Sequence, residues 1–504
     1  MKSLNSRPHR VWMLALLFVA ALTACHSAPD PELSDQRRTL RVGLPYGGMT
    51  DESGLREELT DAFEITHPDI GIELAFAADP AEPSGEPDPM VKLKSLLTGP
   101  RPADVVVFDL NQLPALAQDR LLLPLDSMMK ESGMKPEDFV PAVIETIREH
   151  GDGRRLYALS PTFNASALFY NKALFTRQNV APPTDGMTWE DALILARRLA
   201  SGSGPEAVYG ITFSLWGSAD PFADMDTYAA PLRLRMFDDE AERMTVKSSG
   251  WEEVWSTFRS LYADGVLPTA EAGVTEGGLT GVHRNRPFFA GKAAMTVGNF
   301  SLIQELNEFN RVADRLGMEP VDWGVVPLPV HPQKPDTGLM SIGRLMGINA
   351  GASNPEDAWA FIRFHHGEAR AKQLARNPSV MSTLQFANKA PDGFGYDPAV
   401  FYRLKAGTGL TESESRLYRE RPNLHLVRRL GGMIFRRVIS GELTVAEGLD
   451  EWERSGNELL SSIRQNPDGF LLLDGDGRLP ETGSGGFILP PADGVDEGQF
   501  SEQP

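Results

Sequence analysis

Two kinds of hydrophobic pattern alternate along the first 160 residues and predict strands separated by helices. Continuous apolar or β-branched runs at 39–44, 70–76 and 103–109 are typical of strands buried on both faces of a sheet. The segments 55–66 and 91–97 have helical spacing of their apolar residues. Strands that alternate with helices predict an open α/β sheet.

Two side chains follow strands of this predicted sheet. Tyr46 follows the first strand and Asp109 follows the third. Ligands of open α/β sheets bind beyond the carboxyl ends of the strands, so both residues are candidate ligand contacts. The alternative, that each is an ordinary loop residue, stays open.

A second α/β unit is predicted to begin close to Pro161. An apolar run at 156–160 ends at this proline, and an aromatic-rich strand candidate follows at 167–171. Thr188 and Asp191 then form a capping box at the start of a helix. The length of 504 residues also exceeds what one hydrophobic core usually serves, which favours two domains.

Later segments of the chain predict one further strand and three further helices. The run 209–213 is strand-like, and 251–262 has aromatic residues spaced for one buried helical face. Asn354 and Asp357 form a predicted capping box with Pro355 at the first helical position. A further box at 444–447 opens a helix that extends to about residue 463.

The first 24 residues have the pattern of a secretory signal. Lys2, Arg7 and Arg10 precede an apolar run, 11–22, that is too short for the about 20 residues of a spanning helix. The sequence ending at Cys25 resembles the lipobox of bacterial lipoproteins, in which the cysteine carries palmitate or similar acyl chains. Cys25 is the sole cysteine, and an ordinary signal peptide is the alternative. Residues 25–38 are then a flexible tether.

The order of several motifs resembles that of extracellular solute-binding proteins of family 1, the maltodextrin-binding-protein-like receptors of ABC-type carbohydrate importers. The motifs are Tyr-Ala at 157, Leu-Phe-Tyr-Asn-Lys at 168, Thr-Trp-Glu-Asp at 188 and Gly-Lys-Ala-Ala-Met at 291. The resemblance covers residues 39–463. It implies a two-lobed periplasmic-binding-protein-like fold of type II, with three interdomain crossings and a ligand cleft between the lobes. The implied lobes are 39–160 with 299–343, and 161–298 with 344–465.

The resemblance also implies a set of cleft residues. Phe163 and Asn164 lie at the first crossing, and Asn299 and Phe300 at the expected return. Trp216 follows a strand of the second lobe, where its indole is expected to lie flat against a pyranose ring. Packing of Trp216 into the second-lobe core is the alternative.

Charge and motif content exclude several other functions. The net charge of −20 argues against binding nucleic acid through its phosphates. No phosphate-binding glycine loop, zinc motif or serine elbow is present, so we expect no cofactor, no metal site and no enzymatic activity. Paired carboxylates of a glycosidase cannot be identified by spacing alone.

The segment 466–504 differs from the rest of the chain. It holds 8 glycines and 5 prolines, with 8 acidic residues and one arginine, a composition that predicts disorder. Docking of its apolar patches, 470–473 and 487–489, on the body is the alternative.

The expected function is therefore capture of a carbohydrate by a lipid-anchored receptor. The ligand, an oligosaccharide, is delivered to the permease subunits of an ABC transporter at the extracytoplasmic face of the cell membrane. A surface-tethered sensor or adhesin with the same fold is the first alternative. A surface glycosidase is the second.

Overall fold

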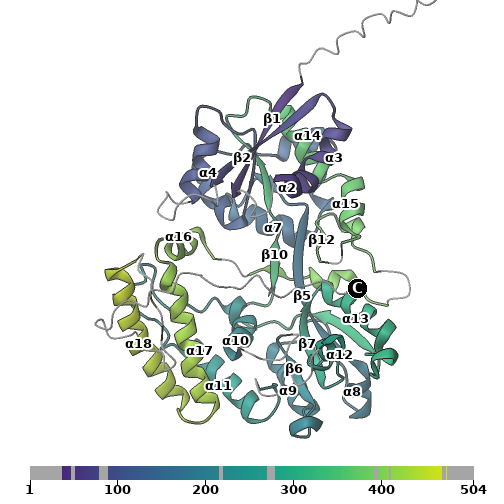
Figure 1. The fold of residues 1–504 in the computed structure, drawn as a ribbon, viewed down its shortest axis with the longest axis vertical. Coiled ribbons are helices and arrows are strands. Elements are labelled where there is room, and N and C mark those ends of the chain that lie inside the picture. Colours follow the sequence, from purple (N-terminus) through teal and green to yellow (C-terminus); the bar gives the residue numbers. More distant parts are fainter. Residues whose placement is uncertain are drawn as a thin grey trace, which may run out of the picture.

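Two mixed sheets organise the chain, and one long strand connects the regions around them (Figure 1). The computed structural model describes residues 37–46, 52–78, 89–214, 220–269, 278–377, 379–390, 395–407 and 410–467, with Leu471 and Leu473. We call the region around the first sheet the first lobe and the region around the second sheet the second lobe. The two lobes follow each other along the long axis of the molecule (Figure 1).

The first sheet has five strands in the order β2-β1-β3-β11-β4. They are β1 (Arg38–Tyr46), β2 (Ile70–Ala78), β3 (Val105–Phe108), β4 (Ala158–Leu159) and β11 (Leu345–Ile348). β1 runs parallel to β2 and β3, whereas β11 is antiparallel to β3 and β4. The three strands predicted from apolar runs are confirmed. The burial of all four residues of β3 explains its unbroken β-branched sequence.

Short helices surround this sheet (Figure 1). They are α2 (Glu52–Leu59), α3 (Asp61–Thr66), α4 (Pro89–Thr98), α5 (Leu113–Gln118), α6 (Asp126–Glu131), α7 (Pro141–His150), α14 (Pro355–His365) and α15 (Glu368–Leu374). α14 begins at Pro355 as predicted, but the expected capping box is wrong. The Asn354 side chain donates to the Thr39 carbonyl at 3.3 Å, and Asp357 pairs with Arg38 at 3.3 Å.

The second sheet has six strands, with β10-β5-β7-β6 as its main path. Its strands are β5 (Thr162–Asn171), β6 (Tyr209–Thr212), β7 (Ala293–Asn299), β8 (Trp323–Pro327), β10 (Met340–Ile342) and β12 (Met381–Ser382). β5 is the central strand, because β7, β8, β10 and β12 all pair with it. A small parallel pair, β9 (Thr337–Gly338) and β13 (Lys405–Ala406), lies apart from both sheets.

Longer helices build the second lobe. They are α8 (Lys172–Arg177), α9 (Trp189–Leu199), α10 (Pro221–Ala229), α11 (Ser249–Ala263), α12 (Gly278–Arg284), α13 (Ser301–Val312), α16 (Glu412–Glu420), α17 (His425–Ile439) and α18 (Val445–Gln465). The capping boxes at Thr188 and Thr444 are confirmed. The predicted aromatic face of α11 is also confirmed, since Trp251, Trp255 and Phe258 are buried in the core.

The strand pairing places the return between the lobes later in the chain than expected. β4 belongs to the first sheet and β5 to the second, so the chain crosses at Ser160–Pro161. Residues 299–327 then stay with the second lobe rather than returning, because β8 pairs with β5 over Ala167–Asn171. The return comes between β10 and β11, at 343–344.

Gly343 and α14 also agree with a return to the first lobe at 343–344. A Cβ on Gly343 would lie 2.4 Å from Thr162 Oγ1, so the glycine allows the outgoing and returning segments to pass closely. α14 packs with the first lobe, not the second as expected, because the Phe361 ring meets Phe63 of α3 edge-on at 5.2 Å. After α15, β12 pairs with the start of β5, and α16, α17 and α18 lie in the second lobe (Figure 1).

Candidate ligand-binding site

The crossing strand β5 carries polar side chains on one face. Thr162, Asn164 and Ser166 are partly exposed, whereas Phe163, Ala165 and Ala167 between them are buried. Alternate residues of a strand share a face, so the three polar side chains form one row where the chain leaves the first lobe.

Neighbouring strands extend this polar row. Asn299 is paired with Ser166, and Ser341 is paired with Asn164. Directly paired residues place their side chains on the same face, which brings amide and hydroxyl groups from three strands together. Both asparagines were predicted as site residues, and the structure places them on the same face of the sheet.

Asn164 has an unused acceptor in this row. Its Nδ2 donates to the Ser379 carbonyl at 3.3 Å, but its buried Oδ1 has no hydrogen-bond partner among the described residues. Asn299 Oδ1 accepts from Ser301 Oγ at 2.7 Å and is therefore held in place. A buried acceptor without a partner is costly, and a ligand hydroxyl would satisfy it.

The two predicted phenylalanines have different positions. Phe163 is 1% exposed, and its ring meets Tyr402 edge-on at 5.9 Å, so it packs in the core and supports Tyr402. Phe300 is partly buried and meets Phe401 edge-on at 5.5 Å. Phe163 therefore offers no surface to a ligand in this structure, whereas Phe300 and Tyr402 retain exposed parts.

The first lobe contributes the edge of its sheet. Gly43 pairs with Val106, and the same register places Tyr46 level with Asp109 just beyond the end of β3. Asp109 is exposed, and its backbone N–H donates to Gln112 Oε1 at 2.9 Å. The backbone of both predicted residues therefore lies at the same edge of the first sheet.

A direct hydrogen bond joins the lobes beside this edge. Asn111 follows Asp109 in the short 3₁₀ turn Leu110–Gln112 and donates from Nδ2 to Ser415 Oγ at 2.8 Å. Ser415 lies on α16, which belongs to the second lobe. α16 therefore lies against the ligand edge of the first sheet.

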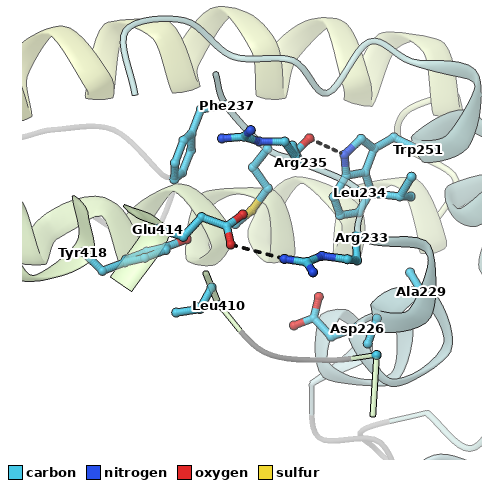
Figure 2. A pocket seen from close by; sticks show the side chains of 13 residues that line it. Asp226, Ala229, Arg233, Leu234, Arg235, Phe237, Trp251, Leu410, Glu414 and Tyr418 are labelled. Atoms are coloured by element: carbon cyan, nitrogen blue, oxygen red, sulfur yellow. Dashed lines mark hydrogen bonds and ion pairs between the residues drawn. The ribbon is translucent and has the colours of Figure 1, made fainter. Parts of the chain in front are cut away.

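α16 also forms one wall of a pocket in the second lobe, shown in Figure 2. The pocket has a volume of about 360 Å³. Its walls are largely apolar or aromatic, with charged groups at intervals: Asp226, Ala229, Ala230, Arg233, Leu234, Arg235, Met236, Phe237, Trp251, Gly407, Leu410, Glu414 and Tyr418. Tyr418 and Phe237 lie with ring centroids 6.0 Å apart, and Leu410 is exposed.

Two charged pairs lie in or beside this pocket. Arg233 approaches Glu414 at 3.5 Å, the pair drawn with a dashed line in Figure 2. Arg428 donates to Asp226 at 2.5 Å. Burial raises the pKa of Asp226, and the positive charge of Arg428 opposes this rise. The pocket thus combines rings with groups that can donate to or accept from hydroxyls.

Two predicted residues, Trp216 and Cys25, lie outside the described part of the chain. Among the described residues no cluster of three or more metal-ligating side chains occurs. In the same part of the chain, no helix is long and apolar enough to span a membrane.

Sequence reasoning missed Ser166, Ser341 and the α16 residues Glu414 and Tyr418. The alternation from Thr162 to Ala167 was a usable signal, because it marks a strand with one polar face. No comparable signal exists for α16, since its role depends on a contact with Asn111, 304 positions away in the sequence.

A model of one protein family matches more than half of this chain. The family model described as "Bacterial extracellular solute-binding protein" matches residues 46–365. The sn-glycerol-3-phosphate-binding periplasmic protein UgpB of Escherichia coli (strain K12) is 25% identical over 171 residues. That match covers 33% of this chain and 37% of the relative, so the chain spans well under half the length of the curated relatives it matches.

Solved structures share the fold at low sequence identity. A sugar transporter of Rhizobium etli in an open conformation has a TM-score of 0.56 at 18% identity and covers 83% of this chain and 99% of its own. The sugar-binding protein MalE of Xanthomonas citri has a TM-score of 0.55 at 20% identity and covers 85% and 98%. An extracellular solute-binding protein of family 1 from Alicyclobacillus acidocaldarius reaches 0.57 at 16%, covering 85% and 99%. These likenesses establish the two-lobed α/β fold.

Proposed function

We propose that this chain, which belongs to the bacterial extracellular solute-binding protein family, captures an oligosaccharide between its two lobes and delivers it to an ABC importer. The observation that carries the proposal is the polar row on β5. Asn164, Ser166 and Asn299 offer amide and hydroxyl groups where the two lobes meet. Sugars need such closely spaced partners, because each carries several hydroxyls that must be hydrogen-bonded once they leave water.

The proposed ligand contacts come from both lobes. Tyr46 and Asp109 approach from the edge of the first sheet, and Asn164, Asn299 and Phe300 from the crossing. Trp216 supplies a ring from the second lobe, against which the apolar face of a pyranose can lie. The pocket of Figure 2 extends the site along α16 and has room for a further sugar unit.

The position of α16 supports the proposal that the lobes close around the ligand. Its Ser415 already accepts a hydrogen bond from the first lobe, while its Glu414 and Tyr418 line the second-lobe pocket. A ligand that contacts both walls stabilises the arrangement in which they approach each other. This arrangement is then the form offered to the permease subunits.

We also propose that Cys25 anchors the mature protein to the cell membrane through acyl chains. The support is the lipobox sequence that ends at the sole cysteine of the chain. Wild-type protein should then leave membranes only with detergent, and Cys25→Ser should be soluble or unprocessed. Wild-type protein found without lipid in the soluble fraction would contradict the anchor but not ligand capture.

Titration calorimetry with neutral oligosaccharides of two to six units tests ligand capture. Binding without turnover of the sugar supports the proposal, and release of shorter sugars would instead indicate a glycosidase. Trp216→Ala should weaken binding about thirtyfold, as loss of a buried aromatic anchor does, while unfolding stays almost unchanged. Ile194→Ala, which changes an exposed apolar residue on α9, is the matched control and should leave binding unchanged.

A phosphorylated polyol is the second candidate ligand. The curated relatives are named for sn-glycerol 3-phosphate, and the guanidinium of Arg233 lies in the pocket of Figure 2. A guanidinium binds phosphate through paired hydrogen bonds. Binding of sn-glycerol 3-phosphate, lost in Arg233→Ala and without binding of neutral sugars, would favour this candidate over the first.

A further inference from the structure

One face of α17 carries basic residues in a strongly acidic chain. His425, Arg429 and Arg436 recur at intervals of four and seven residues, which places them on one side of the helix. Together with residues around them they line a cavity of about 590 Å³ on the second lobe: Asp220, Phe222, His425, Arg428, Arg429, Gly432, Met433, Arg436 and Leu473.

α17 contains two sets of neighbouring arginines, 428–429 and 436–437. In each set one arginine forms an ion pair and the other does not, within the described part of the chain. Arg428 pairs with Asp226 at 2.5 Å, and Arg437 pairs with Glu442 at 2.7 Å and Glu451 at 2.6 Å. The other member of each pair, Arg429 and Arg436, is exposed and has no ion pair within the described part of the chain. We call the side of α17 that bears His425, Arg429 and Arg436 the basic face.

The C-terminal segment of the chain reaches this cavity. Leu473 is only 7% exposed and lines the cavity, and Leu471 packs against the same core. Leu471 and Leu473, the two described residues of the apolar patch 470–473, therefore lie against the second-lobe core. The remainder of the tail lies outside the described residues.

The residues that follow Leu473 carry the opposite charge. Asp474 and Asp476 come directly after it, and 474–504 hold seven acidic residues against the single Arg478. Consecutive Cα atoms are about 3.8 Å apart, so Asp474 follows within one residue of a cavity lined by Arg429 and Arg436, neither of which has an ion pair among the described residues.

We propose that the acidic segment 474–481 docks on the basic face of α17 in its own chain. Leu471 and Leu473 fix its start, and its carboxylates pair with Arg429 and Arg436. The covalent link gives this segment a high effective concentration at the cavity, which an acidic partner in solution lacks. The net charge of −20 also repels a second copy of the chain.

Trypsin provides a direct test, because Arg478 is the only basic residue after Arg464. Docking should protect the bond between Arg478 and Leu479 in the native full-length protein. Arg429→Ala with Arg436→Ala should speed its cleavage about fivefold at low salt, and 1 M NaCl should speed cleavage of the wild type similarly. The rate is read from the mass of the released 479–504 peptide.

Two further variants separate docking from a general loss of stability. Asp474→Asn with Asp476→Asn removes the proposed partners without adding a tryptic site, and it should accelerate cleavage by the same factor. Combined with the two arginine changes it should add nothing further, because each change breaks the same pairs. Arg198→Ala, at an exposed arginine of α9 without an ion pair in the described residues, is the control and should match the wild type.

Unchanged cleavage in both double variants, or effects that simply add, would overturn the proposal. Protection that grows with protein concentration would overturn it as well, since it would show docking between two copies. None of these outcomes depends on which solute the lobes bind.

Discussion

A different kind of side chain lies at a central contact point inside each lobe. In the first lobe, a buried carboxylate joins distant segments of the sheet and its flanking turn. Asp104 is 3% exposed and accepts hydrogen bonds from the backbone of Arg41, Ser353 and Asn354 and from the Ser353 hydroxyl, at 2.9 to 3.2 Å. Asn349 adds two bonds, to the carbonyls of Leu97 and Ala103.

In the second lobe, stacked rings have the corresponding role. Trp452 on α18 stacks on Trp255 of α11 at 5.4 Å and meets Trp251 and Phe222 edge-on at 5.2 and 5.5 Å. Its indole N–H donates to the Val427 carbonyl of α17 at 3.0 Å, and Phe222 belongs to α10, so four helices meet at this side chain. Asp104 is thus a polar anchor of the first lobe and Trp452 an aromatic anchor of the second, and we expect loss of either one to open its own lobe first.

The largest expected effect is on the second lobe. Trp452→Ala should lower the free energy of unfolding of the second lobe by about 4 kcal/mol, because it leaves a cavity at the centre of the ring cluster. Chemical denaturation followed by tryptophan fluorescence measures the loss. Ile194→Ala, at an exposed position of the same lobe, should cost less than about 0.5 kcal/mol. A loss that is equally small for Trp452→Ala would mean that the ring cluster does not hold the lobe.

Asp104→Ala should be the next most damaging change, at about 3 kcal/mol in the first lobe. It removes an acceptor from three backbone N–H groups, two of which follow β11. Hydrogen exchange should show faster opening of 345–354 while the core of α17 and α18 stays protected. Equal acceleration in both lobes would contradict independent anchoring.

These contrasts explain which parts of the fold were predictable from sequence. β1, β2 and β3 follow from local apolar runs, and the caps at Thr188 and Thr444 follow from residues three positions apart. The return to the first lobe was placed too early, because only the pairing of β8 with β5 reveals where 299–327 belong. In the site, Asn164 and Asn299 share a face of the sheet as a local strand pattern allows, whereas the pocket on α16 depends on distant contacts.

Acid should destabilise the first lobe by up to about 3 kcal/mol between pH 8 and pH 5.5. Burial, with the charges of His366 and Arg370, lowers the pKa of His365 to about 3, and burial lowers the pKa of His366 to about 4. Both values lie below the usual 6.5, so the unfolded chain takes up protons first as the pH falls below 6.5. Each histidine then costs about 1.4 kcal/mol per pH unit, and above pH 6.5 the effect is absent.

Urea unfolding across this pH range measures the slope. His366→Gln should remove about half of it, whatever the change does to stability at pH 8. Ile194→Ala, which removes no titratable group, should keep the wild-type slope. A wild-type slope in His366→Gln would show that other groups cause the acid sensitivity.

The smallest expected effect concerns the contact between the lobes themselves. The hydrogen bond from Asn111 to Ser415 crosses between them, so neither lobe needs it for its own core. Asn111→Ala should therefore leave the unfolding of both lobes within about 0.5 kcal/mol of the wild type. It should weaken ligand binding up to about fivefold, because a bond worth about 1 kcal/mol no longer favours the arrangement in which α16 lies against the first sheet. Calorimetry gives the affinity, and small-angle scattering should show a larger mean radius of the unliganded protein.

Ser415→Ala should act in the same way, and the double variant should be no worse than either single change, since all three remove one bond. A loss of affinity in only one of the two single variants would assign that residue to the ligand rather than to the interlobe contact.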